Sequence, residues 1–177
     1  YSKSPAKLSE FGHPQGLGIP ANTFTGFLMI SAVVFGAFIS FSGIYADKIG
    51  RRRFLIWVTF AMLAFGLLMP QFLTHGSPAS VLAFLLIGMA LMGLTFGPMA
   101  ALLPELFPTE VRYSGASLAY NFAAIIGASI ATLVAIELNA YYGIIGVGLY
   151  LAANCVLTLL ALNSTHETKD VDLVDTQ

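Results

Sequence analysis

Long apolar runs separated by short polar breaks make up most of this chain. Asp, Glu, Lys and Arg are absent from residues 11–46, 54–104, 113–136 and 138–166. A membrane span needs only about 20 such residues, and backbone groups in lipid must bond within their own segment, so each run predicts a helix. The breaks divide the runs into five predicted transmembrane helices, at residues 21–45, 54–74, 79–103, 114–136 and 144–163.

Composition supports lipid as the solvent. Apolar residues make up 57% of the chain and charged residues 10%, with a mean hydropathy of +0.81, which is too apolar for a soluble domain. The continuous runs lack the alternation of a β-barrel. Eight cations against nine anions argue against a nucleic-acid partner. The single cysteine, Cys155, excludes an internal disulfide and offers no metal pair. We therefore expect an all-α integral membrane protein without metal or cofactor.

The distribution of Lys and Arg predicts the orientation, because cytoplasmic loops retain these residues. Six of the eight fall on one side of the predicted bundle and two, Lys3 and Lys7, on the other. We expect residues 1–20 to be extracytoplasmic, residues 21–163 to form the bundle, and the acidic residues 164–177 to form a cytoplasmic tail. The chain begins with Tyr1 and shows no signal-peptide pattern, so we expect it to be a piece of something longer.

Small residues four apart mark a face of the fourth predicted helix for close packing, because helices in lipid associate through close backbone approach. A second such motif, Gly93 to Gly97 followed by Pro98, lies in the third helix. We expect the face on the fourth helix to meet another helix, inside or outside this chain. Its members are Gly115, Ala119, Ala123, Gly127 and Ala131.

The polar break GIYADKIGRRRF, residues 43–54, carries one carboxylate and four cations. Its glycines allow a tight turn with close helix approach, and Asp47 at the membrane edge can pair with an arginine or face a helix N-terminus. A topology signal is the simpler interpretation. Positive charge alone, however, would not require two glycines and an aspartate at these offsets.

This spacing, Gly43-x-x-x-Asp47-Lys48-x-Gly50-Arg51-Arg52, resembles the loop signature of the major facilitator superfamily. A second segment, residues 97–129, resembles the penultimate cytoplasmic loop and eleventh helix of its metabolite:proton symporter branch. Its most specific part is the run LPELFPTEVRYSGAS, residues 103–117. The resemblance implies that the five helices correspond to helices eight to twelve of a twelve-helix transporter. They would then form most of its C-terminal six-helix half, in a cell inner membrane or a plasma membrane.

The resemblance also implies alternating access, in which two six-helix halves rock around a site at mid-membrane. In the family the loop signature acts as a cytoplasmic latch. A structural ion-pair cluster without gating is the competing interpretation. Carried over to this chain, the latch residues are Gly43, Asp47, Lys48, Gly50, Arg51 and Arg52, with Glu105 and Arg112 close enough to join them.

Candidate substrate contacts are few, because no ionisable residue lies at mid-membrane depth in the predicted helices. We select Tyr120 and Asn121, with Asn154 as a weaker choice, although an Asn in lipid also bonds to neighbouring helices. Glu137, at the outer end of the fourth helix, is a candidate for the outer gate. The proton-carrying residue of an intact transporter is expected in helices that precede this chain.

The leading hypothesis is thus part of a proton-coupled symporter of a small metabolite of the carboxylate, shikimate-like, proline or betaine class. Its partners would be the lipid bilayer, the substrate, the proton and the N-terminal helices, and the chain alone would not transport. The alternative is a small non-transporting membrane protein that assembles with partner helices. An enzyme is the weakest interpretation, because no nucleophile with its base and no phosphate-binding loop is found.

Overall fold

The computed structural model describes residues 20–74 and 77–164, and its regular elements there are all α-helices. The predicted all-α class is confirmed. The four elements are long and apolar enough, by length and composition, to cross a membrane. Residues 1–19 and 165–177, which hold most of the two predicted terminal segments, lie outside the described part. The elements are α1 (Ala21–Ile49), α2 (Arg51–Thr74), α3 (Pro78–Glu105) and α4 (Arg112–Ser164).

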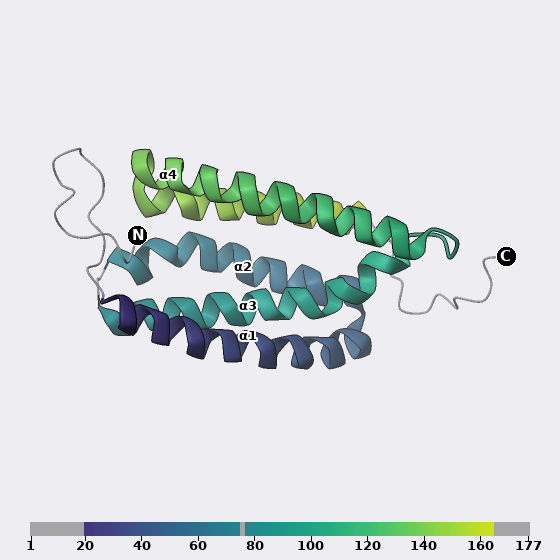
Figure 1. The fold of residues 1–177 in the computed structure, drawn as a ribbon, viewed down its shortest axis with the longest axis horizontal. Helices are drawn as coiled ribbons and strands as arrows, with labels where there is room; N and C mark the ends of the chain where they lie inside the picture. Colours follow the sequence, from purple (N-terminus) through teal and green to yellow (C-terminus); the bar gives the residue numbers. More distant parts are fainter. Residues whose placement is uncertain (1–19, 75–76, 165–177) are drawn as a thin grey trace.

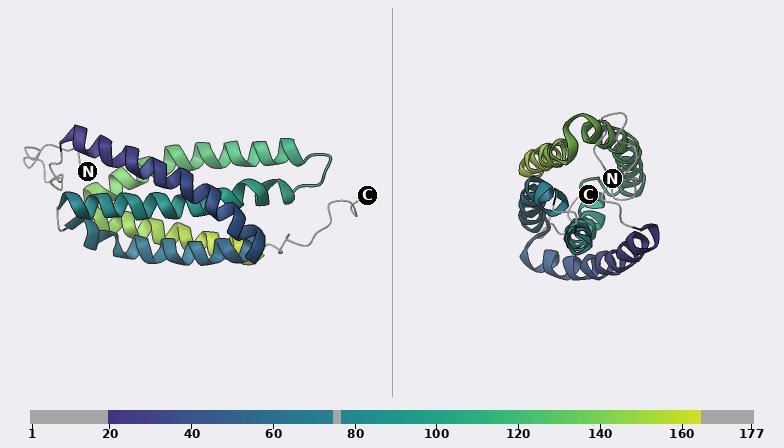
Figure 2. Two further views of the ribbon diagram at one scale, coloured as in Figure 1. Left: turned by 90° about the horizontal axis from the view of Figure 1, so that it is seen from below. Right: turned by 90° about the vertical axis from the view of Figure 1, so that its left-hand side faces the viewer.

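Helix α4 is two helical arms joined at Gly143. The element has 53 residues and would extend about 80 Å if it were straight, at about 1.5 Å per residue. Gly143 has φ 66° and ψ −160°, a backbone conformation that is essentially restricted to glycine. The chain reverses direction there and the arms diverge (Figure 1, Figure 2). We call residues 112–142 the first arm and residues 144–164 the second arm. With α1, α2 and α3, the two arms make five long helical segments in the described residues.

The predicted break between the fourth and fifth helices, residues 137–143, is longer than the break in the structure. Residues 137–142 are helical, and only Gly143 departs from helical geometry. Polar side chains such as Glu137 do not end a helix, because the backbone hydrogen bonds of the helix do not depend on side-chain polarity. The reversal needs a residue that tolerates positive φ, and Gly143 supplies it.

The polar break between the first two predicted helices is also shorter than expected. Helix α1 continues to Ile49 rather than residue 45, and α2 begins at Arg51 rather than residue 54. Only Gly50, with φ 106°, lies between them. All five charged residues of this break therefore lie on the ends of α1 and α2. The remaining predicted boundaries agree within about two residues, the usual uncertainty of helix ends.

Two close helix crossings define the packing. Helix α1 packs mainly against α3, and α2 mainly against α4. In the first pair, a Cβ atom on Gly93 would lie 2.6 Å from the Phe35 carbonyl oxygen. In the second pair, a Cβ atom on Gly148 would lie 2.5 Å from the Gly66 carbonyl oxygen. The predicted close contact of the Gly93 to Gly97 motif is thereby confirmed, and α1 is its partner.

The first arm of α4 is exposed along most of its length. Helices α3 and α4 share the fewest contacts of any pair that touches. At the start of the arm, a Cβ on Gly115 would meet the Phe107 ring, whereas a Cβ on Gly127 would meet nothing within 4 Å. Within the described residues, the face of small residues on this arm packs against the Phe107 ring at Gly115, whereas nothing contacts it at the Cβ position of Gly127. Its predicted contact with a further helix stays a prediction.

Candidate functional site

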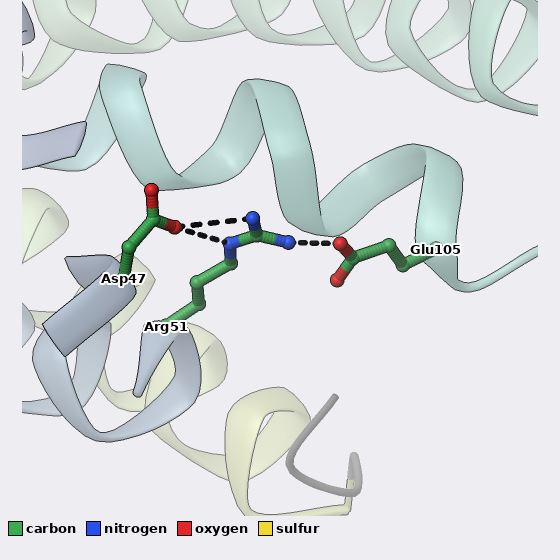
Figure 3. Close-up of polar contacts among 3 residues, drawn as sticks. All are labelled: Asp47, Arg51 and Glu105. Atoms are coloured by element: carbon green, nitrogen blue, oxygen red, sulfur yellow. Dashed lines mark hydrogen bonds and ion pairs between the residues drawn. The ribbon is translucent and has the colours of Figure 1, made fainter. Parts of the chain in front are cut away.

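Arg51 joins the ends of three helices in one ion-pair cluster. Its Nε and Nη2 atoms each lie 3.1 Å from Oδ1 of Asp47, on the last turn of α1. Its Nη1 atom bonds to Oε1 of Glu105, the last residue of α3. Figure 3 shows the guanidinium lying between the two carboxylates. We call Asp47, Arg51 and Glu105 the latch cluster.

The local backbone explains how residues from separate helices meet. The Gly50 N–H donates to the Ala46 carbonyl over 2.9 Å, and the Phe54 N–H donates to the Gly50 carbonyl over 3.0 Å. These two bonds fix the end of α1 and the start of α2 at the one-residue turn, which keeps Asp47 and Arg51, four residues apart, within reach of each other. Glu105 arrives because α3 is packed along α1 at the glycine crossing.

The two ion pairs of the latch cluster differ in exposure. The side chains of Arg51 and Glu105 are 22% and 21% exposed, whereas that of Asp47 is 63% exposed. A pair open to water is worth about 0–1 kcal/mol, because water and salt screen the charges. Screening is weaker for the half-buried pair, so Arg51 and Glu105 carry the stronger interaction.

Among the other residues predicted for this site, Arg52 and Arg112 bond to groups outside the three side chains of the latch cluster. Arg52 points to the end of α4, where it bonds to the carbonyl oxygens of Leu162 and Asn163. The Arg112 Nη2 atom lies 3.5 Å from Thr109 Oγ1, and that is its bond within the described residues. Lys48 is exposed on the last turn of α1.

The two glycines of the predicted motif, Gly43 and Gly50, have different surroundings. Gly50 makes the turn, as predicted. Gly43 lies inside α1, and a Cβ atom there would meet nothing within 4 Å. The close approach comes from the facing residue on α3, because a Cβ on Gly97 would lie 3.3 Å from the Gly43 nitrogen.

Tyr120 and Asn121 lie together beside a hollow of about 650 Å³ between α3 and the first arm of α4. Both side chains are exposed. The amide nitrogen of Asn121 donates to the Ser117 carbonyl over 2.8 Å, so it bonds to its own helix rather than to a neighbouring one. The hollow is lined by apolar and neutral polar side chains, including Phe96 and Met99 on α3.

Asn154 and Glu137 lie elsewhere. Asn154, on the second arm of α4, borders two further hollows of about 500 and 680 Å³, and its amide nitrogen donates to the Tyr150 carbonyl over 2.8 Å. It therefore does not share the hollow of Tyr120 and Asn121. Glu137 is exposed on the first arm, near the reversal at Gly143 and away from the latch cluster.

The family is decided by a match along most of the chain. Residues 15–177 match the profile of the family described as "Sugar (and other) transporter". The chain belongs to this family. The sugar (and other) transporters are major facilitator proteins, so the resemblance carried by the two sequence segments is confirmed, and the family is one of transporters rather than enzymes.

Curated relatives narrow the comparison within the sugar (and other) transporters. The chain is 67% identical to a "Putative metabolite transport protein" of Haemophilus influenzae, over 99% of this chain and 40% of that protein. It is 51% identical to the inner membrane metabolite transport protein YhjE of Escherichia coli, over 90% of this chain and 37% of that protein. It is 31% identical to the proline/betaine transporter of Salmonella typhimurium, over 81% of this chain and 29% of that protein. No solved structure matches the chain.

The chain therefore spans about 40% of the length of the curated relatives that it matches first. It is a multi-pass membrane segment of the transporter family, and one of its relatives is described as an inner membrane protein.

Sequence reasoning missed three contacts that hold the site. The Ser42 hydroxyl, fully buried, lies 3.2 Å from the Gly93 carbonyl oxygen and links α1 to α3. Gly66 and Gly148 form the crossing of α2 with α4. Asn163 accepts from Arg52. The one available signal was the position of a serine and glycines inside apolar runs, which does not name their partners.

Proposed function

We propose that this chain is part of a proton-coupled symporter of a small metabolite and that it corresponds to helices eight to twelve of a twelve-helix transporter. Family membership and metabolite-transporter relatives support this proposal. The observation that carries it is the latch cluster, in which Arg51 joins the ends of α1, α2 and α3. The cluster lies where the family signature predicts a cytoplasmic latch.

The latch cluster would act by biasing a conformational equilibrium. In alternating access, the cytoplasmic ends of the two halves separate and close again. Ion pairs that hold the ends of α1, α2 and α3 together favour one arrangement of that face. Because each exposed pair is worth about 0–1 kcal/mol, the cluster shifts populations without locking them.

Substrate would be held beside the first arm of α4. Tyr120 and Asn121 offer a hydroxyl and an amide next to a largely apolar hollow, and this combination suits a small solute with few polar groups. Relatives named for proline and betaine support the proline or betaine class, and the carboxylate and shikimate-like classes remain part of the proposal. Asn154 is a weaker contact, and Glu137 is proposed for the outer gate.

The open faces of the bundle support a partner made of further helices. Hollows of about 500 to 680 Å³ lie along the inner side of α4, and the first arm is exposed over most of its length. We propose that the N-terminal helices of the complete transporter cover them and supply the proton-carrying residue. The bundle would lie in an inner or plasma membrane with its C-terminus in the cytoplasm.

A second candidate function uses the same open face. A small membrane protein that binds partner helices without transporting would also need the small-residue face of α4. The observation that favours it is Gly127, where a Cβ atom would meet nothing within 4 Å in this chain. Crosslinking from this face separates the two functions, because a specific partner other than transporter helices would support the assembly protein.

Transport by a chimera tests the proposed function. The chain would replace the segment that it matches in the 67% identical Haemophilus influenzae relative. The chimera and the 177-residue chain alone would be reconstituted in vesicles, and uptake of labelled proline, glycine betaine and small carboxylates would be measured with and without a pH gradient. We expect gradient-dependent uptake by the chimera only. Uptake by the chain alone would overturn the expected dependence on further helices, and gradient-independent uptake by the chimera would overturn proton coupling.

A further inference from the structure

Two adjacent arginines at the start of α2 contact opposite sides of the bundle. Arg51 bonds to residues of α1 and α3, whereas Arg52 reaches the end of α4. The Arg52 Nε atom lies 2.7 Å from the Leu162 carbonyl oxygen. Its Nη2 atom lies 3.2 Å from both the carbonyl and the side-chain oxygen of Asn163.

The acceptors of Arg52 are groups that a helix leaves without partners. Leu162 and Asn163 belong to the last turn of α4, which ends at Ser164, and the last four carbonyls of a helix lack partners within it. The C-terminal end of a helix also carries partial negative charge, which a cation stabilises. A guanidinium suits this place because its planar fork can donate to two acceptors at once.

The contact between Arg52 and the end of α4 also offsets unfavourable positive charge at the N-terminal end of α2. Arg51, Arg52 and Arg53 occupy the first turn of α2, where the partial positive charge of the helix repels cations. The carboxylates of the latch cluster compensate Arg51. The negative end of α4 compensates Arg52, which is half-buried, while Arg53 is exposed.

We infer that Arg52 is a positioning residue that fixes the C-terminal end of α4 to the N-terminal end of α2. The contact of Arg52 and the crossing of Gly66 and Gly148 together hold α2 against the second arm of α4 at two points along their length. This role separates Arg52 from the latch cluster, to which the sequence motif alone assigns it. The inference does not depend on transport, because it concerns contacts within this chain.

A distance measurement between the two helix ends tests the inference. Spin labels would be placed at the exposed positions Trp57→Cys and Ser164→Cys of the full chain carrying Cys155→Ala, in lipid nanodiscs. We expect Arg52→Gln to broaden the distance distribution at least twofold. Arg53→Gln, which removes the same charge from the neighbouring exposed position, is the matched control and should leave the distribution unchanged. Equal distributions in the two variants would overturn the inference.

A second variant keeps the inference testable if Arg52→Gln disturbs folding. Asn163→Ala removes one acceptor at the exposed end of α4 and leaves the interior intact. Asn163→Ala should broaden the distance distribution less than Arg52→Gln does. Arg52→Lys should give a distribution narrower than that of Arg52→Gln. In the double variant, Asn163→Ala should add nothing to Arg52→Gln, because the two residues share one contact. Additive effects would contradict the shared contact and overturn the inference.

Discussion

Replacing Gly93 by alanine tests the closest approach in the bundle. The added Cβ atom would lie 2.6 Å from the Phe35 carbonyl oxygen, 2.9 Å from the Phe38 Cβ atom and 3.3 Å from the Ile39 nitrogen. Two of these three atoms belong to the backbone of α1, which no change of rotamer can move aside. Helices α1 and α3 must therefore separate, and the hydrogen bond from Ser42 to the Gly93 carbonyl weakens as they do.

The expected loss of stability in Gly93→Ala follows from comparison with Gly88, a second glycine on the same helix. A Cβ atom on Gly88 would lie 3.4 Å from the Phe65 ring, which is ordinary contact. Both substitutions gain roughly 0.5–1 kcal/mol of helix preference, so this contribution cancels in the difference. The overpacking term of about 1–3 kcal/mol remains. We expect Gly93→Ala to be less stable than Gly88→Ala by about that amount.

Unfolding of the purified chain in graded SDS and mild-detergent mixtures, followed by helix content, would measure the difference. Each variant would be compared with the parent chain in the same micelles. Equal stability of Gly93→Ala and Gly88→Ala would refute the close crossing of α1 and α3. A Gly93→Ala chain more stable than the parent would refute it more strongly.

Three further predictions concern the latch cluster, the reversal and the orientation. Glu105→Gln should increase the mobility of a spin label at Ile49, whereas Glu110→Gln on the exposed loop should not; equal mobility would argue against the Arg51–Glu105 pair. Gly143→Ala should destabilise the chain by about 1–3 kcal/mol, because the positive-φ conformation of Gly143 is essentially closed to residues with a Cβ atom, and unchanged SDS unfolding would contradict this. In the Cys155→Ala chain, Arg53→Cys should resist an impermeant maleimide applied outside intact cells; labelling from outside would reverse the orientation.

The sequence by itself determined that the chain is built of long apolar membrane helices. Charge-free runs longer than a bilayer core identify membrane helices, because lipid forces each backbone to bond within its own segment. This constraint is local, so it can be read without knowing any partner. The motif from Gly43 to Arg52 and the segment around Glu105 likewise indicated the family.

Only the tertiary structure decided which helices pair and where each arginine points. Seventeen glycines make many close crossings possible, and only the packed chain selects Gly93 against α1 and Gly148 against Gly66. Arg51 and Arg52 are neighbours in sequence, yet a helix directs adjacent side chains about 100° apart, so one meets Glu105 and the other the end of α4. Pairing depends on shape across helices, which a pattern of apolar residues does not encode.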